Sequence, residues 1–126
     1  MVKIGVDLHA RNGSVVMQLD SSVPLRPQRM EAEGILELCT RLVAAGIEVH
    51  VCYEAGPCGY GLYRGIVALG GHCYVVAPVK LSDGRNQKTD GLDAAALTGQ
   101  LERYLSGNRK AFSVIRVPSE EEEQRR

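Results

Sequence analysis

Two aspartates three residues apart, Asp90 and Asp93, stand where the sequence predicts the start of a helix. Residues at that spacing lie on one face of a helix, so both carboxylates could point into one site. Two further acids, Asp7 and Glu54, each end an apolar stretch with the composition of a strand. In open α/β sheets, ligands bind in the crevice beyond the carboxyl ends of the strands. The sequence therefore predicts that four acids from three segments converge at one edge of a sheet.

Oxygen ligands without histidine or cysteine suit Mg²⁺ or Mn²⁺, and a bound cation relieves the repulsion between clustered carboxylates. Two such ions roughly 3.5–4 Å apart would activate the attacking oxygen and stabilise the leaving oxygen in phosphodiester transfer. In that scheme we expect Asp7 to bridge the ions and Glu54 and Asp93 to complete their coordination. Asp90 would be a further ligand or an orienting group.

Most of these acids also have a structural interpretation. Asp90 could be a helix N-cap and Asp93 a first-turn acid that favours the helix dipole. Glu54 could cap the helix that follows its glycine-rich turn. Asp7 is harder to explain in this way, because an acid that ends an apolar central strand needs a partner.

The elements that must position these acids follow from the apolar periodicity. It predicts strands over 2–7, 14–20, part of 23–30, 48–54 and 72–77, and helices over 31–45, 59–69 and from the acid pair to about residue 105. A right-handed crossover through the first helix makes the strand ending in Glu54 parallel to the strand ending in Asp7. Three antiparallel strands followed by two parallel strands with intervening helices give an RNase H-like α/β fold.

The C-terminal stretch predicts the start of another helix. Ser119 is a favourable N-cap, and Glu122 stands three residues later, as in a capping box. We therefore expect a catalytic domain over 1–117, with 118–126 as the start of a truncated helix or a linker to a missing C-terminal domain. A frayed charged tail is the alternative.

Overall charge gives little information about partners. The chain of 126 residues has the size of one domain, and its 15 basic residues balance 15 acidic ones. Between residues 80 and 116 basic residues outnumber acids, and two bound metal ions would make that surface more basic, which would suit a phosphate backbone. An ordinary mixed surface explains the same distribution.

The chain shows no N-terminal signal segment and no apolar run near the ~20 residues of a membrane span, so we expect a cytoplasmic protein without membrane contact. The four cysteines show no C-x-x-C spacing and are expected to be free thiols. Together with His50 and His72 they fit no recognised zinc pattern, and we do not expect a zinc site.

Four other residues are candidates for nucleic-acid contacts. Arg85 and Lys88, before the acid pair, could bind phosphates or be solvated charges. Tyr60 could approach nucleic acid or pack at a helix start. His9, two residues after Asp7, could touch the metal site or a phosphate, although a loop histidine is more often solvated.

Three segments, Asp7–His9, Tyr53–Gly61 and Lys88–Ala94, resemble the signature segments of the DEDD-type insertion-sequence transposases. The resemblance covers nearly the whole chain in the right order. It implies an N-terminal RuvC-like domain of RNase H fold, with Mg²⁺ or Mn²⁺ held by the Asp, Glu, Asp, Asp set. It also implies action on DNA, a bridge RNA as guide in at least some members, and a homo-oligomer for the full-length protein.

The sequence departs from this family in two respects. The family has a C-terminal domain with a serine nucleophile, and no serine of this chain matches it, so the chain alone could be inactive. The loop over 80–87 is also less regular than the basic loop of the family.

Two other classes of function remain open. A nucleotide-binding domain of the actin or sugar-kinase type shares the core but needs glycine and a hydroxyl after the first acid, where this chain has Leu8 and His9. A non-catalytic nucleic-acid-binding or oligomerisation module would use the acids only for folding.

Overall fold

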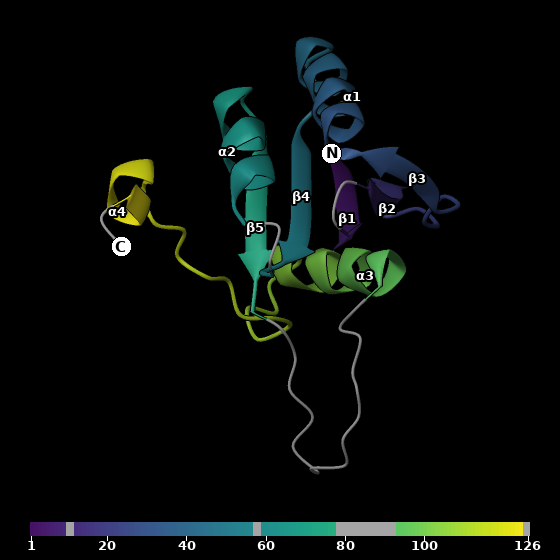
Figure 1. The fold of residues 1–126 in the computed structure, drawn as a ribbon. Coiled ribbons are helices and arrows are strands. Elements are labelled where there is room, and N and C mark those ends of the chain that lie inside the picture. Colours follow the sequence, from purple (N-terminus) through teal and green to yellow (C-terminus); the bar gives the residue numbers. More distant parts are fainter. Residues whose placement is uncertain (10–11, 57–58, 78–92, 125–126) are drawn as a thin grey trace.

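A five-stranded mixed sheet forms the centre of the computed structural model, which describes residues 1–9, 12–56, 59–77 and 93–124 (Figure 1). The strands are β1 (Val2–His9), β2 (Asn12–Leu19), β3 (Gln28–Glu31), β4 (Val49–Glu54) and β5 (His72–Val76). The described helices are α1 (Ala32–Ala44), α2 (Gly61–Ala68), α3 (Ala94–Leu105) and α4 (Glu120–Gln124).

The strand order is β3-β2-β1-β4-β5, so the strand that carries Asp7 is central, as predicted. β2 is antiparallel to both β1 and β3. β4 is parallel to β1, and β5 is parallel to β4. The predicted mixed α/β sheet of three antiparallel and two parallel strands is therefore confirmed.

Helices cover the two faces of the sheet unequally. On one face, Ile4, Val6 and Tyr53 are buried in a large apolar cluster with residues of α1 and α2. The helices α1 and α2 lie next to each other, and α3 lies apart from them (Figure 1). The other face carries a smaller cluster in which Cys52 and Val76 meet Leu97 and Leu101 of α3. Each fully buried aliphatic side chain contributes roughly 1.5–3 kcal/mol, so the α1 and α2 face supplies most of the stability.

α3 approaches β1 so closely that only glycine fits beneath it. A Cβ at Gly5 would collide with the Ala94 carbonyl oxygen and the Thr98 hydroxyl, and would lie 2.7 Å from the Thr98 amide nitrogen. The buried Thr98 hydroxyl lies 3.1 Å from the Val16 carbonyl oxygen of β2 and 2.7 Å from the Ala94 carbonyl oxygen. The start of α3 is therefore held against β1 and β2.

Two local predictions need correction. The first two strands, predicted over 2–7 and 14–20, extend to His9 and begin at Asn12, because the β1–β2 ladder continues beyond the apolar pattern and pairs Asn12 with His9. The third helix starts at Ala94 and not at the acid pair, because Asp93 has extended backbone angles and is its N-cap.

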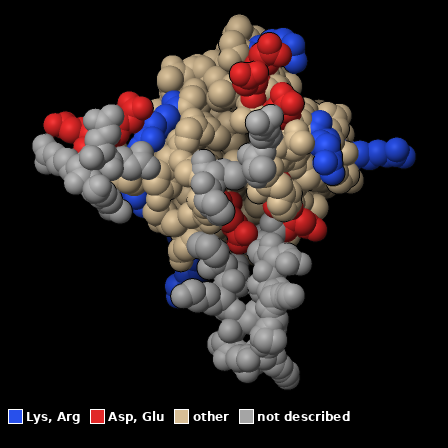
Figure 2. Space-filling view, viewed as in Figure 1, with Lys and Arg blue, Asp and Glu red and all other residues tan. Residues whose placement is uncertain are grey.

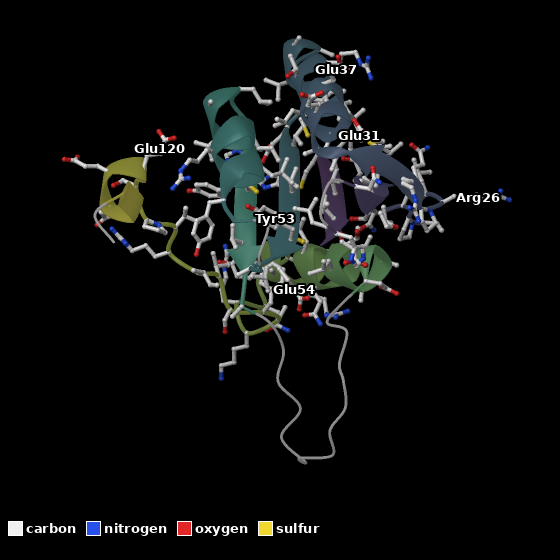
Figure 3. All side chains as sticks on the ribbon, viewed as in Figure 1. Arg26, Glu31, Glu37, Tyr53, Glu54 and Glu120 are labelled. Atoms are coloured by element: carbon white, nitrogen blue, oxygen red, sulfur yellow. The ribbon has the colours of Figure 1, made fainter. Side chains whose placement is uncertain are left out.

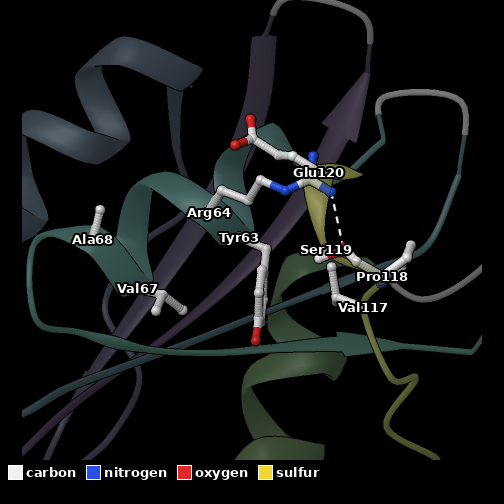
Figure 4. A pocket seen from close by; sticks show the side chains of 8 residues that line it. All are labelled: Tyr63, Arg64, Val67, Ala68, Val117, Pro118, Ser119 and Glu120. Carbon is white, nitrogen blue, oxygen red and sulfur yellow. Dashed lines mark hydrogen bonds between the residues drawn. The ribbon is translucent and has the colours of Figure 1, made fainter. Parts of the chain in front are cut away.

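The C-terminal segment returns along α2. Arg64 donates a hydrogen bond to the Pro118 carbonyl oxygen at 2.9 Å, across a cavity of about 350 Å³ between α2 and residues 117–120 (Figure 4). The predicted capping box is present: the Ser119 hydroxyl accepts from the Glu122 amide at 3.1 Å, and Glu122 accepts from the Ser119 amide at 2.8 Å. The helix start predicted from this sequence is therefore correct. Among the described helices, none combines the length and the hydrophobicity that a bilayer crossing requires.

Candidate metal centre

Asp7 lies near the carboxyl end of the central strand. In β1 alternate residues face opposite sides, so Lys3, Gly5 and Asp7 share the face that α3 covers, whereas Ile4 and Val6 enter the core. The Asp7 side chain is 28% exposed, and its Oδ2 lies 3.2 Å from Nε2 of His9. A partly buried acid beside an exposed histidine can accept a cation from solvent.

Glu54 ends the neighbouring parallel strand. Val6 pairs with Tyr53, so Asp7 and Glu54 follow side by side in register at the same edge of the sheet. Cys52 packs against α3, and the alternation of the strand puts Glu54 on that same face. Figure 3 shows Glu54 at the end of β4, beside α3. The register therefore places both acids at the same edge of the sheet.

A buried tyrosine fixes the turn that follows Glu54. The Tyr53 hydroxyl donates to the Gly59 carbonyl oxygen at 3.1 Å and accepts from the Tyr63 amide at 3.3 Å. Burial raises the pKa of this phenol, so the hydroxyl stays protonated and keeps its donor role. The backbone after Glu54 is thus tied to the start of α2.

Asp93 reaches this edge as the N-cap of α3. Its Oδ1 accepts a hydrogen bond from the Ala96 amide at 2.8 Å, which satisfies one of the free N–H groups of the first turn. The next residue, Ala94, lies against Gly5, two positions before Asp7. Asp93 therefore has a structural role, and its second carboxylate oxygen has no hydrogen bond within the described part of the chain.

Three of the predicted site residues lie outside the described residues: Asp90, Arg85 and Lys88. The other two nucleic-acid candidates are placed. His9 is 74% exposed beside Asp7, which puts it at the predicted metal edge. Tyr60 packs against the larger core cluster, with the Arg64 guanidinium 5.9 Å from its ring centroid, as expected for a packed aromatic at a helix start.

The arrangement suits a hard divalent cation better than a soft one. Asp7, Glu54 and Asp93 offer carboxylate oxygens from three distant segments at one edge, which is the ligand chemistry of Mg²⁺ and Mn²⁺. The carboxylate oxygens of these three acids do not all lie within 4.8 Å of one another. A cation bound by these acids would need further oxygen ligands from water or substrate, as is common for Mg²⁺.

Comparison with curated proteins gives relatives over most of the chain. The chain is 31% identical over 118 residues to the transposase for insertion sequence element IS1533 of Leptospira borgpetersenii, across 90% of this chain and 34% of the relative. It is 40% identical over 92 residues to y4qE of Sinorhizobium fredii, named as a transposase, across 71% of this chain and 22% of the relative. The chain is thus similar to proteins named as transposases. It spans about a third or less of the length of these relatives, and no protein-family model matches it.

The surface charge of the described residues is mixed. On the face shown in Figure 2, basic and acidic side chains alternate and form no single basic patch among the described residues. Residues 80–92 of the predicted basic region over 80–116 lie outside the described residues. The described surface therefore does not distinguish the predicted basic face from an ordinary mixed surface.

A second group of ligand atoms, which the sequence analysis missed, lies at the opposite ends of the strands. Among the described residues, the group of Glu48, His50 and His72 brings one ligand atom of each side chain within 4.8 Å of the others. Burial lowers the pKa of His50, whereas the hydrogen bond from His50 lowers the pKa of Glu48. His50 and His72 are cross-strand partners in the parallel pair, a relation that spacing along the sequence does not reveal.

Proposed function

We propose that this chain is the metal-binding, RuvC-like domain of a DEDD-type insertion-sequence transposase, and that it contributes to DNA binding, phosphodiester cleavage and strand transfer. The observation that carries the proposal is the position of Asp7 and Glu54. Asp7 lies near the carboxyl end of β1 and Glu54 ends the neighbouring parallel strand β4, on the face that α3 covers, and the N-cap of α3 is Asp93. The similarity to named transposases over 90% of the chain supports the same conclusion.

The residues of this edge then have separate roles. Asp7, on the central strand, would bridge two Mg²⁺ or Mn²⁺ ions, and Glu54 and Asp93 would complete their coordination, with Asp90 as fourth acid. Such ions would polarise the scissile phosphate and lower the pKa of the attacking oxygen. His9 lies 3.2 Å from Asp7, close enough to orient that carboxylate or to contact a phosphate.

The partners of the whole protein follow from this proposal. DNA is the substrate, a bridge RNA is the proposed guide, and the full-length protein would assemble as a homo-oligomer. Arg85, Lys88 and Tyr60 are proposed nucleic-acid contacts. A serine nucleophile would come from a further domain of the full-length protein, since the chain spans only 34% of its IS1533 relative.

Calorimetric titration of Mn²⁺ into the purified chain tests the metal centre. We expect saturable binding that Asp7→Asn and Glu54→Gln each weaken at least about tenfold, because each removes one charged ligand. Glu37→Gln is the matched control, since Glu37 is an exposed acid on α1, away from this edge (Figure 3). Equal affinity in all four proteins would contradict the proposed centre.

Cleavage of transposon-end DNA by the full-length protein tests the activity. Asp7→Asn should abolish cleavage in Mg²⁺ while leaving the thermal unfolding midpoint unchanged. Full activity of that variant, or ATP binding by the isolated chain in place of DNA cleavage, would refute the transposase assignment of this edge.

A further inference from the structure

Two histidines and a glutamate meet at the amino ends of β4 and β5, at the opposite end of the strands from Asp7 and Glu54. Within the described part of the chain, these three side chains each have one ligand atom within 4.8 Å of the ligand atoms of the other two. We propose that Glu48, His50 and His72 form a binding site for Zn²⁺ or a similar transition-metal ion. This site is separate from the proposed carboxylate centre and does not depend on the proposed function.

The ligand set fits zinc in type and number. Two imidazoles and one carboxylate with an open fourth position form a common catalytic zinc set, and imidazole nitrogen selects Zn²⁺, Cu²⁺ or Ni²⁺ over Mg²⁺. Tetrahedral bonds of about 2.0–2.1 Å place ligand atoms roughly 3.3 Å apart. To reach that spacing, Nε2 of His50 and Oε2 of Glu48, which are 2.6 Å apart, would separate, and the His72 nitrogen, within 4.8 Å of the other ligand atoms, would move closer.

One ligand is fixed and two can move. His50 is buried, and its ring is stacked on that of His72, with centroids 4.5 Å apart and planes 13° from parallel. His72 and Glu48 are exposed, and His72 lies on the edge strand β5. A rotation of the His72 ring would turn one of its nitrogens toward an ion held by His50, at little cost in packing.

The buried ring is already oriented by a second contact. Nδ1 of His50 lies 2.9 Å from the Tyr74 hydroxyl, and Nε2 lies 2.6 Å from Oε2 of Glu48. A tyrosine hydroxyl can donate or accept, so it can hold either tautomer of the ring. Because a carboxylate only accepts, Nε2–H is the donor to Glu48 in this structure, and Nδ1 accepts from the Tyr74 hydroxyl. Metal binding would require the other tautomer, in which Nδ1–H donates to Tyr74 and the Nε2 lone pair faces the ion. Such partners are the usual means of orienting a metal-bound histidine.

The surrounding charge is balanced. Lys3 stands beside His50 in the parallel register, and its ammonium would oppose a cation if it were unpaired. Its Nζ lies 2.6 Å from Glu102 and also donates to the Asp20 carbonyl oxygen. Glu102 thus neutralises Lys3, and Glu48 supplies negative charge to the site itself.

Titration of Zn²⁺ alone into the purified chain, followed by calorimetry and by thermal unfolding, tests the proposal. We expect one saturable Zn²⁺ and a rise in the unfolding midpoint, because binding to the native state alone stabilises it. His72→Gln and Glu48→Gln should each weaken the affinity at least about tenfold and remove the rise. Both residues are exposed, so the variants should fold.

Glu37→Gln is the matched control, because Glu37 is also an exposed acid but belongs to α1, which packs on the other face of the sheet from His50. It should bind Zn²⁺ as the unmodified chain does. Absence of Zn²⁺ binding, or equal binding by the His72→Gln and Glu48→Gln variants, would overturn the proposal. Loss of Zn²⁺ binding in His9→Gln with retention in His72→Gln would also overturn it, since the ion would then lie at the carboxylate edge.

Discussion

The two ends of the same sheet carry opposite ligand chemistry. At the carboxyl ends of the strands, Asp7, Glu54 and the helix cap Asp93 offer oxygen alone, in an open arrangement. At the amino ends, His50 and His72 offer nitrogen and Glu48 oxygen, in a closer group. Strand ends therefore gather side chains from distant segments wherever the register aligns them, and the ligand type would then decide which ion each proposed site accepts.

α3 packs against residues at both ends of the sheet, so a substitution that displaces this helix is expected to have the largest effect. Gly5→Ala should destabilise the fold by about 2–3 kcal/mol, because the added methyl group meets backbone atoms of α3 that cannot move independently. Urea unfolding followed by circular dichroism measures this. The affinity of Gly5→Ala for Mn²⁺ should fall together with its stability, because Asp93 moves with the helix.

Gly99→Ala is the matched control, since it adds the same methyl group to α3 at a site where the nearest atom is 4.0 Å away. It should stabilise the protein by up to about 1 kcal/mol, because alanine has the higher helix propensity. A larger loss of stability in Gly99→Ala than in Gly5→Ala would contradict the close packing of α3 on β1.

Cross-titration sharpens the comparison of the two ends. Asp7→Asn should weaken Mn²⁺ binding at least about tenfold and leave Zn²⁺ binding unchanged, whereas His72→Gln should do the reverse, because each ion follows its preferred ligand type. Calorimetry of both variants with both metals gives the four affinities. If one substitution weakens both metals equally, the two ends do not act as separate sites.

Substitutions at Asp93 separate capping from metal binding. Asp93→Ala should cost about 1 kcal/mol, because the Ala96 amide loses its acceptor, whereas Asp93→Asn should keep most of the cap. Both should weaken Mn²⁺ binding. Urea unfolding and calorimetry on the same samples test this, and unchanged Mn²⁺ affinity in Asp93→Asn would leave Asp93 with the structural role alone.

The smallest effect is expected at α4, far from both ends. The Ser119 amide and the Arg116 guanidinium lower the pKa of Glu122, so its ionised form favours the helix start. This contribution is complete above the ordinary pKa of 4.5 and is lost as the pH falls through the lowered value. Amide chemical shifts of residues 120–122 should report that loss, and Glu122→Gln should remove the pH dependence without altering either metal affinity.

The sequence sufficed for the parts of the fold that local pattern determines. The apolar periodicity predicted the five strands, and the crossover rule made the strand that ends in Glu54 parallel to the strand that carries Asp7. The start of α3 was misplaced because an acid before a helix fits both the cap and the first turn. The close contact between Thr98 and Gly5 fixes where α3 lies and so decides between these two positions. It is a tertiary contact, which a local sequence pattern does not show.

The Glu48, His50 and His72 group was missed for a different physical reason. Metal patterns recognisable in a sequence have ligands close together on one element, whereas His50 and His72 belong to two strands joined by α2. Only the parallel register makes them neighbours. The register of β4 against β5 was not part of the sequence prediction, so the alternation of each strand alone could not show the pair.

The hydrogen bond from Thr98 to Val16 has a consequence for the order of folding. It joins residues 82 positions apart, whereas the β1–β2 hairpin closes locally. Contacts of such long sequence separation form late, because the entropy of closing the intervening chain is lost before they contribute. Docking of α3, and with it the arrival of Asp93, should therefore be a final step. A nascent or partly folded chain would lack cation affinity at this edge until the sheet is complete.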